Sequence, residues 1–164
     1  MLLRPAQSKD IHNLAKMWYD GWHDAHAALV PAEYARERTL ERFRDNLVSR
    51  LDHVYVIVDD NDKPIGLSIT KDDELNQFYV SAESRGKGVA QVLIADVEKR
   101  LAEQGHDTIW LACAIGNYRA ARFYEKSGWH LATNFVVELP TPGAVFSIEV
   151  WRYEKQVGRC IGAA

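Results

Sequence analysis

The spacing of apolar residues changes along the chain and predicts its helices and strands. A short apolar start over 1–4 predicts an edge strand. Helical spacing follows, which predicts a first helix over about 9–25 with Ser8 as its N-cap. Pro31 predicts the start of a second helix, whose apolar positions continue through Leu47.

Three apolar runs separated by short polar turns come next. They predict strands over 54–58, 64–70 and 74–80 that pair as an antiparallel meander. The third strand enters a turn with two glycines. Apolar residues on one helical face then predict a helix that begins near Val89 and stops at Gly105.

The rest of the chain predicts a mixture of strands and one short helix. The almost wholly apolar run over 108–114 predicts a strand covered on both faces. Asn117 is the expected N-cap of a short helix closed by Gly128. Further strands are expected near 129–131, 134–139 and 145–153, with a turn at Pro140, Pro142 and Gly143 and a flexible tail over 156–164. No repeat or linker interrupts the pattern, so we expect a single domain over 1–164.

Composition excludes several functional classes. Of the 164 residues, 47% are apolar and 26% charged, as is usual for a globular protein. No apolar run approaches the ~20 residues that span a bilayer, and the start lacks a signal-peptide pattern. We therefore expect a cytoplasmic protein with no membrane partner. The net charge of −3 argues against a nucleic-acid partner, which favours a basic field.

Positive charge is concentrated around the two-glycine turn. Through Glu83 there are fifteen acidic and ten basic residues, whereas 84–126 holds seven basic and five acidic. Gly86 and Gly88 lack a Cβ, so backbone N–H groups can converge on a ligand, and the helix that follows adds the positive end of its dipole. The turn therefore predicts an anion cradle, although a plain strand-to-helix turn fits the same residues.

The cysteines and histidines predict no metal site. Cys113 and Cys160 are too few for a disulfide framework or a zinc site, and Cys113 is expected to be a buried core thiol. His23 and His26 are three residues apart on a predicted helix, without a third ligand candidate nearby.

Two motifs carry a resemblance to a known family. One is Arg85-Gly86-Lys87-Gly88-Val89-Ala90 after a strand; the other is Asn117 followed by Tyr124-Glu125-Lys126-Ser127-Gly128-Trp129. With the order of elements, they make the chain resemble the GCN5-related N-acetyltransferase (GNAT) superfamily. The resemblance implies an α+β fold of the three-layer α/β type. Its mixed, mostly antiparallel sheet would have six to seven strands, flanked by about four helices.

The resemblance also implies an N-acetyltransferase that moves the acetyl group of acetyl-CoA to a primary amine of a small molecule, peptide or protein, without a metal. The pyrophosphate would lie on the backbone N–H groups of 85–90, and the pantetheine arm would pair with the end of the strand over 74–80. The implied cofactor-binding residues are Phe78, Tyr79, Val80, Arg85, Gly86, Lys87, Gly88, Val89, Ala90, Asn117, Ala120 and Tyr124.

Tyr124 matches the family's general acid, which would protonate the CoA thiolate. Glu74 is the candidate general base and, by strand alternation, is expected to share a face with Asn76 and Phe78. Three alternatives remain open. Glu74 could be only a solvated turn residue, and His23 or His26 could be a base that titrates near neutrality. The reaction could also proceed without a dedicated base.

The acceptor is not identified by the sequence. In this fold class the first two helices and the terminal hairpin build the pocket, which points to Trp22, His26 and Tyr34, and to the surroundings of Phe135 and Phe146. A non-catalytic acyl-CoA-binding or sensing module is the alternative function. The oligomeric state, a homodimer included, and the acyl-chain specificity stay open.

Overall fold

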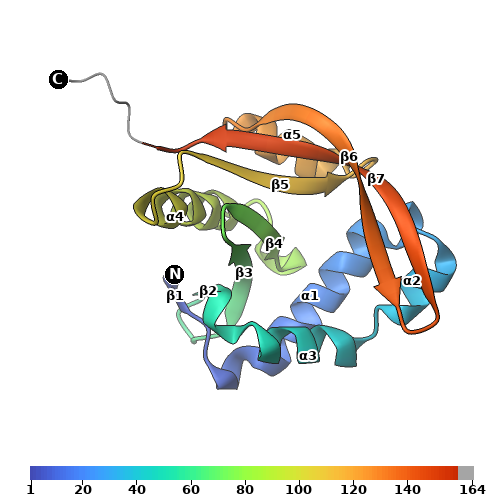
Figure 1. The fold of residues 1–164 in the computed structure, drawn as a ribbon. Helices are drawn as coiled ribbons and strands as arrows, with labels where there is room; N and C mark the ends of the chain where they lie inside the picture. The colour runs from blue at the N-terminus through green and yellow to red at the C-terminus, as the bar shows by residue number, and fades with distance from the viewer. Residues whose placement is uncertain (159–164) are drawn as a thin grey trace.

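The computed structural model describes residues 1–158, which form one seven-stranded sheet and five α-helices (Figure 1). The strands are β1 (Leu2–Pro5), β2 (Val54–Val58), β3 (Pro64–Lys71), β4 (Glu74–Val80), β5 (Thr108–Ala114), β6 (His130–Thr141) and β7 (Ala144–Gln156). The helices are α1 (Ile11–His26), α2 (Ala32–Glu37), α3 (Leu40–Ser49), α4 (Val89–Glu103) and α5 (Tyr118–Lys126).

The sheet opens between its two halves. Its strand order is β1-β2-β3-β4-β5-β7-β6, and every neighbouring pair is antiparallel except β4 and β5. These two are parallel and share a single register pair, Glu74 with Trp110. β5 instead pairs with β7 along its whole length. The predicted three-layer α+β fold with a mixed, mostly antiparallel sheet is confirmed.

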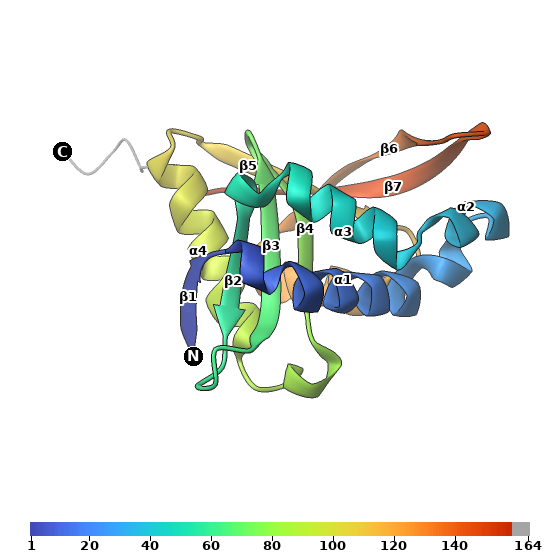
Figure 2. The same ribbon diagram turned by 90° about the horizontal axis from the view of Figure 1, so that it is seen from below.

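Two hydrophobic clusters hold the layers together. Figure 2 shows α1 and α3 lying across the meander of β2, β3 and β4, where their apolar residues form the first cluster. The second lies between α4, α5 and the strands β4, β5 and β7. Trp18 and Phe43 in the first cluster and Leu101 and Ile109 in the second are at most 1% exposed. The second cluster contains Leu75 of β4 as well as Ile109 and Leu111 of β5, so packing against α4 and α5 joins the two halves of the sheet where their strands diverge.

Several predicted boundaries match the structure. The strands over 54–58, 74–80 and 108–114 have the predicted limits. α4 begins at Val89 as expected. The expectation that β5 is covered on both faces is wrong, because only alternate residues are buried and Ala112 is exposed.

The N-terminal helices differ from the prediction. The first turn is a 3₁₀ segment over Ser8–Asp10, and its N-cap is Gln7, whose N–H donates to the Asp10 carboxylate at 2.8 Å. The predicted second helix is two helices, because Arg38 leaves helical geometry at φ −85° and ψ 69°. Thr39 then caps α3 by accepting a hydrogen bond from the Arg42 N–H.

The end of the chain holds fewer and longer strands than predicted. The separate strands near 129–131 and 134–139 are one strand, β6, with a register shift between Leu131 and Thr133. Pro140 lies inside β6, and β6 and β7 continue past the end of β5 and descend beside α2 in Figure 1. The predicted tail begins too early, since β7 includes Gln156 and the N–H groups of Val157 and Gly158 donate to the Asp107 carbonyl. Its remainder, 159–164, and Cys160 with it, lie outside the described residues.

Among residues 1–158, no helix is both long and apolar enough to cross a membrane.

Candidate functional site

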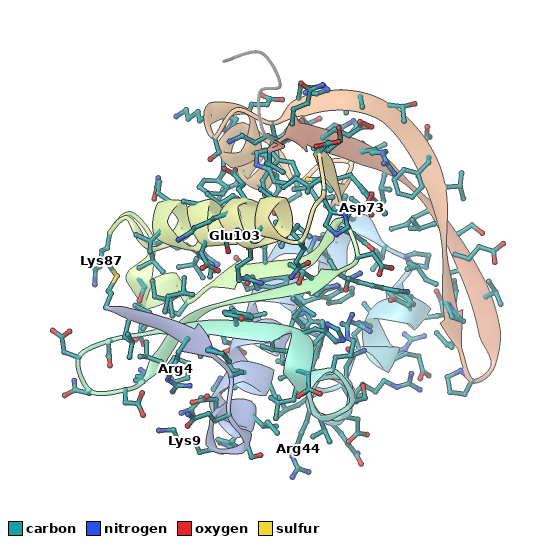
Figure 3. The ribbon with its side chains drawn as sticks, turned by 60° about the vertical axis from the view of Figure 1, so that its left-hand side comes forward. Arg4, Lys9, Arg44, Asp73, Lys87 and Glu103 are labelled. Atoms are coloured by element: carbon teal, nitrogen blue, oxygen red, sulfur yellow. The ribbon has the colours of Figure 1, made fainter. Side chains whose placement is uncertain are left out.

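A cleft of about 690 Å³ occupies the opening between β4 and β5. α1, the two-glycine turn, α5 and the β6–β7 hairpin contribute its other walls. The predicted residues that line it are Trp22, His26, Tyr34, Glu74, Phe78, Tyr79, Val80, Arg85, Gly86, Gly88, Val89, Ala90, Asn117, Ala120 and Tyr124. Lys87 does not line it and lies at the outer edge of the turn before α4 in Figure 3.

One edge of β4 offers free backbone groups to this cleft. Residues 77–80 pair in regular antiparallel register with β3, and the Ser81 N–H continues the ladder by donating to the Ile65 carbonyl at 2.9 Å. Because N–H groups alternate between the two edges of an antiparallel strand, those of Phe78 and Val80 point to the opposite edge. That edge faces the cleft, since β5 has diverged from it.

The two-glycine turn has the geometry of an anion cradle. Gly86 and Gly88 have φ values of 76° and 82°, a region that L side chains rarely adopt, and a Cβ at either position would meet no atom within 4 Å. Gly88 is the N-cap of α4, so the first N–H groups of this helix have no partner within it. The turn therefore presents free N–H groups and the positive helix end to open space, as a phosphate requires.

Asp24 on α1 joins this turn to α5. Its carboxylate accepts hydrogen bonds from Arg85 at 3.4 Å and from Arg119 at 3.1 Å. Both arginines line the cleft, and the two pairs, led by the one with Arg119, hold the pKa of Asp24 below its ordinary value. No sequence pattern pointed to Asp24 or Arg119, because the contact joins residues 95 positions apart. Arg122 and Lys126, nearer the family motif, do not line the cleft.

Asn117 fixes the start of α5 at the inner wall of the cleft. Its side-chain oxygen accepts a hydrogen bond from the Ala120 N–H at 3.3 Å, which confirms the predicted N-cap. The predicted burial of Cys113 is also confirmed, at 4% exposure, and the residue lies in the cleft wall. Burial raises the pKa of this thiol to about 12, so it stays protonated at neutral pH.

Tyr124 lies beneath the same wall. Its ring is 8% exposed and packs against Phe78, Phe123, Trp129 and Tyr153. Burial raises the pKa of its phenol well above the ordinary value, with smaller contributions from Cys113 and Tyr79. Within residues 1–158 its hydroxyl makes no hydrogen bond, while the residue lines the cleft. This phenol therefore keeps its proton and is free to donate it.

A bulge in β4 changes the predicted surroundings of Glu74. The β3 register shifts so that Thr70 pairs with Leu75 and Ile69 with Gln77, which leaves Asn76 as the extra residue. Asn76 donates to the Glu74 carboxylate at 3.1 Å, so these two side chains lie together as expected.

The expectation that Phe78 shares this face is wrong. The extra residue shifts the alternation, and Phe78 packs instead on Phe123 and Tyr124 of α5. Burial raises the pKa of Glu74, against the opposing effect of the Asn76 hydrogen bond. Glu74 thus lines the cleft as a partly buried carboxylate with one amide partner.

His26 lies beside β4, where its Nδ1 is 3.5 Å from the Tyr79 hydroxyl. Burial lowers the pKa of His26 to about 4, which disfavours the alternative in which this residue titrates near neutrality. His23 donates from Nε2 to the Arg38 carbonyl at 2.7 Å, which commits this nitrogen to a structural hydrogen bond.

Aromatic rings form the end of the cleft nearest α2. Trp22 and Tyr34 lie 5.9 Å apart between ring centroids, and Phe146 of β7 packs on Tyr34 at the same separation. Phe135 contacts Trp110 instead, and neither phenylalanine lines the cleft. The hairpin residues that do are Val137, Leu139 and Ile148. This end is therefore apolar on the hairpin side and amphipathic on the side of α1 and α2.

No group of three or more potential metal-ligating side chains occurs within the part of the chain that the structure covers.

Comparison with known proteins gives concordant matches. The model of the acetyltransferase (GNAT) family matches residues 13–129. An uncharacterized N-acetyltransferase of Bacillus subtilis, YuaI, is 24% identical over 119 residues, which cover 66% of this chain and 69% of that protein.

Solved structures share the fold at low identity. The PaiA N-acetyltransferase of Thermoplasma acidophilum, solved in complex with coenzyme A, superposes with a TM-score of 0.74 at 18% identity, covering 94% of this chain and 98% of that one. A phosphinothricin acetyltransferase of Sinorhizobium meliloti, in complex with AcCoA, gives a TM-score of 0.72 at 13% identity, covering 99% and 91%.

Proposed function

The chain belongs to the acetyltransferase (GNAT) family, and on that premise we propose that it transfers the acetyl group of acetyl-CoA to a primary amine of a small molecule, peptide or protein. The observation that carries this proposal is the opening of the sheet. β4 and β5 part after one register pair, and the cleft between them joins free strand N–H groups to a glycine cradle.

The chain has residues suited to each part of the coenzyme. The N–H groups at the start of α4, with Gly86 and Gly88, would hold the pyrophosphate, and Arg85 would add positive charge. The free edge of β4 at Phe78 and Val80 would pair with the amides of the pantetheine arm, as an added strand does. Asn117 and Ala120 would line the opposite side of the arm.

The bound coenzyme supplies an acetyl thioester, whose carbonyl carbon the neutral amine attacks. The N–H groups of Phe78 and Val80 both point to the cleft edge, and whichever of them is not paired with a pantetheine amide is suited to stabilise the oxyanion that forms. Tyr124 would protonate the departing sulfur, because burial keeps its phenol protonated. The same burial disfavours a thiolate beside it, so the raised pKa of the phenol is accompanied by a raised pKa of the departing thiol.

Glu74 is the proposed acceptor of the proton that the amine loses, directly or through water. Burial raises the pKa of its carboxyl group and so makes the carboxylate a better base than an exposed one. Its bond to Asn76 holds it toward the cleft. An acceptor that already binds as the free amine would need no such base.

Release of free thiol from acetyl-CoA tests the proposal. The protein is incubated with acetyl-CoA and a panel of amino acids, polyamines, aminoglycosides and peptide N-termini, and free CoA is followed with a thiol reagent. We expect acceptor-dependent release with at least one class. Tight CoA binding without turnover across the panel, with propionyl and succinyl donors included, would contradict acetyl transfer and favour the non-catalytic acyl-CoA-binding module.

A further inference from the structure

Two partly buried arginines lie near the acceptor end of the cleft without an ionic partner. The Nε atoms of Arg38 and Arg50 are buried and make no hydrogen bond, and neither guanidinium forms an ion pair within residues 1–158. Arg42, their neighbour on α3, differs because it pairs with Glu37 at 3.1 Å. Unpaired buried charge is costly to a protein, so two such groups need an explanation.

The break between α2 and α3 fixes the position of Arg38. Its N–H donates to the Ala35 carbonyl, and its own carbonyl accepts the 2.7 Å hydrogen bond from His23. Thr39 then starts α3 in a new direction. The backbone at Arg38 is therefore anchored on both sides, and its side chain extends from a rigid corner.

Aromatic faces surround the Arg38 guanidinium. Its central carbon lies 4.4 Å from the ring centroid of Phe43, 5.3 Å from that of Trp22 and 5.9 Å from that of Tyr34. Rings at these distances stabilise the positive charge but accept no conventional hydrogen bond from the in-plane N–H groups. The rings thus hold the guanidinium in place, and its N–H groups remain available to donate to a bound anion such as a carboxylate.

Arg50 connects the same region to the proposed base. Its Nη1 donates to the Asn76 side-chain oxygen at 2.8 Å, and the Asn76 amide donates to Glu74. Burial lowers the pKa of Arg50, while the Glu74 charge opposes this shift and the Arg38 charge adds to it. The positive charges of Arg38 and Arg50 therefore disfavour each other, and bound negative charge near them would reduce that effect.

Arg38 also stands between two cavities. Trp22 and Tyr34, which stack near it, line the main cleft. Arg38 itself lines a second, more open cavity of about 480 Å³ along α3, with Arg42, Asp45, Asn46 and Ser49. The Asn46 side-chain oxygen there is buried and has no hydrogen-bond partner among residues 1–158. Arg38 does not itself line the main cleft, and its contacts with Trp22 and Tyr34 place it directly behind these two wall residues.

We propose that the acceptor is a small amine that also carries a carboxylate, as an amino acid does, and that Arg38 binds this carboxylate. This inference rests on the proposed acetyl transfer. The planar guanidinium binds a carboxylate with two parallel hydrogen bonds, and Arg50 adds a second positive charge. The amine of such an acceptor would be directed toward Glu74, which shares the Asn76 bridge with Arg50.

Calorimetric titration of the protein–CoA complex tests the inference. The probes are the twenty common L-amino acids and their carboxamides, which keep the amine and side chain but lose the negative charge. We expect at least one amino acid to bind about tenfold or more tightly than its amide. Arg38→Gln should reduce that preference to about twofold or less.

Arg42→Gln is the matched control, because Arg42 lines the same second cavity but is already paired with Glu37. It should leave the preference unchanged. If no amino acid binds better than its amide, or if the preference survives in a folded Arg38→Gln protein, the inference is wrong. Should Arg38→Gln fail to fold, the inference is still tested by the preference for amino acids over their amides in the wild type and in Arg50→Gln.

Thiol release with the same panel separates this inference from the proposed function. If the amino-acid amides are acetylated as fast as the amino acids, the proposed carboxylate site is wrong while acetyl transfer is still supported. No turnover with any acceptor would contradict acetyl transfer, while the binding comparison would still report on Arg38.

Discussion

Tyr124 and Cys113 are two weakly acidic side chains that burial keeps neutral beside the cleft. Cys113 is a packing residue, since a protonated, buried thiol is a poor nucleophile. Tyr124 differs because its hydroxyl has no partner in the described chain and the residue lines the space where the thioester would lie. Its proposed role as proton donor depends on the phenolic oxygen alone.

Replacing Tyr124 with Phe removes that oxygen and keeps the ring. We expect kcat to fall by about 10²-fold or more, the usual contribution of a general acid, with CoA affinity nearly unchanged. Steady-state kinetics and CoA titration measure the two effects. Tyr153→Phe is the control, because Tyr153 packs on Tyr124 but its hydroxyl binds Glu125 outside the cleft. Equal losses of turnover and affinity in Tyr124→Phe would identify a packing residue.

His26 makes stability depend on pH. Its pKa is about 4 in the folded protein, below the ordinary value of 6.5. Between these values the unfolded chain binds a proton that the folded protein does not, so this contribution to stability is complete above about pH 6.5 and is lost as pH falls toward 4. From pH 7 to 4.5, His26→Gln should therefore lose about 2 kcal/mol less unfolding free energy than the wild type. Urea denaturation at a series of pH values measures this, and parallel losses would contradict it.

The sequence predicted the motif residues better than the acceptor site. Asn117 and Tyr124 stand in a local motif, so their places on α5 followed from the chain alone. Arg38 and Asp24 could not be found this way. Arg38 depends on a helix break that the apolar spacing did not reveal, although Thr39 before Leu40 is a capping signal. Asp24 acts through Arg85 and Arg119, which are distant from it in sequence.

At the scale of elements, the turn between β4 and α4 and the bulge in β4 shape the site. The glycine turn was predictable because it needs residues with positive φ. The bulge was not, since nothing in the run over 74–80 marks Asn76 as an extra residue, and strand alternation therefore misplaced Phe78. The same bulge lets Asn76 bridge Arg50 and Glu74.

A pair of glycine variants tests the cradle. Gly88 and Gly105, near the two ends of α4, both have positive φ and open space around a Cβ, but only Gly88 lines the cleft. Alanine at either position should cost about 1 kcal/mol of unfolding free energy through backbone strain. Only Gly88→Ala should weaken CoA binding, by about tenfold. Equal CoA affinity in the two folded variants, measured by calorimetry, would contradict the cradle.

At the scale of the whole molecule, the sheet is two packed halves with a cleft between them. One hydrophobic cluster packs α1 and α3 on β2 and β3, and the second packs α4 and α5 on β4, β5 and β7. Asp24 links the glycine turn to α5 across the cleft through Arg85 and Arg119. The resemblance carried by the motifs and the order of elements implied the mixed sheet, while the opening between β4 and β5 required the strand register.

Coenzyme that contacts both halves should stabilise the entire fold. At one hundred times its Kd, CoA adds about 2.7 kcal/mol to the unfolding free energy. For a chain of this size the melting temperature should then rise by roughly 5–10 °C. Pantetheine at the same concentration should raise it less, because it lacks the phosphates that the cradle would bind. Equal rises in melting temperature with CoA and with pantetheine would contradict the assignment of the glycine turn to the binding site.

A crystal structure of the CoA complex tests the central claim most directly. We expect the pantetheine amides along the free edge of β4 at Phe78 and Val80, the pyrophosphate on the N–H groups of 85–90, and the sulfur within hydrogen-bond reach of the Tyr124 hydroxyl. Coenzyme bound away from the opening between β4 and β5, or a sheet in which these strands pair along their length, would contradict the account.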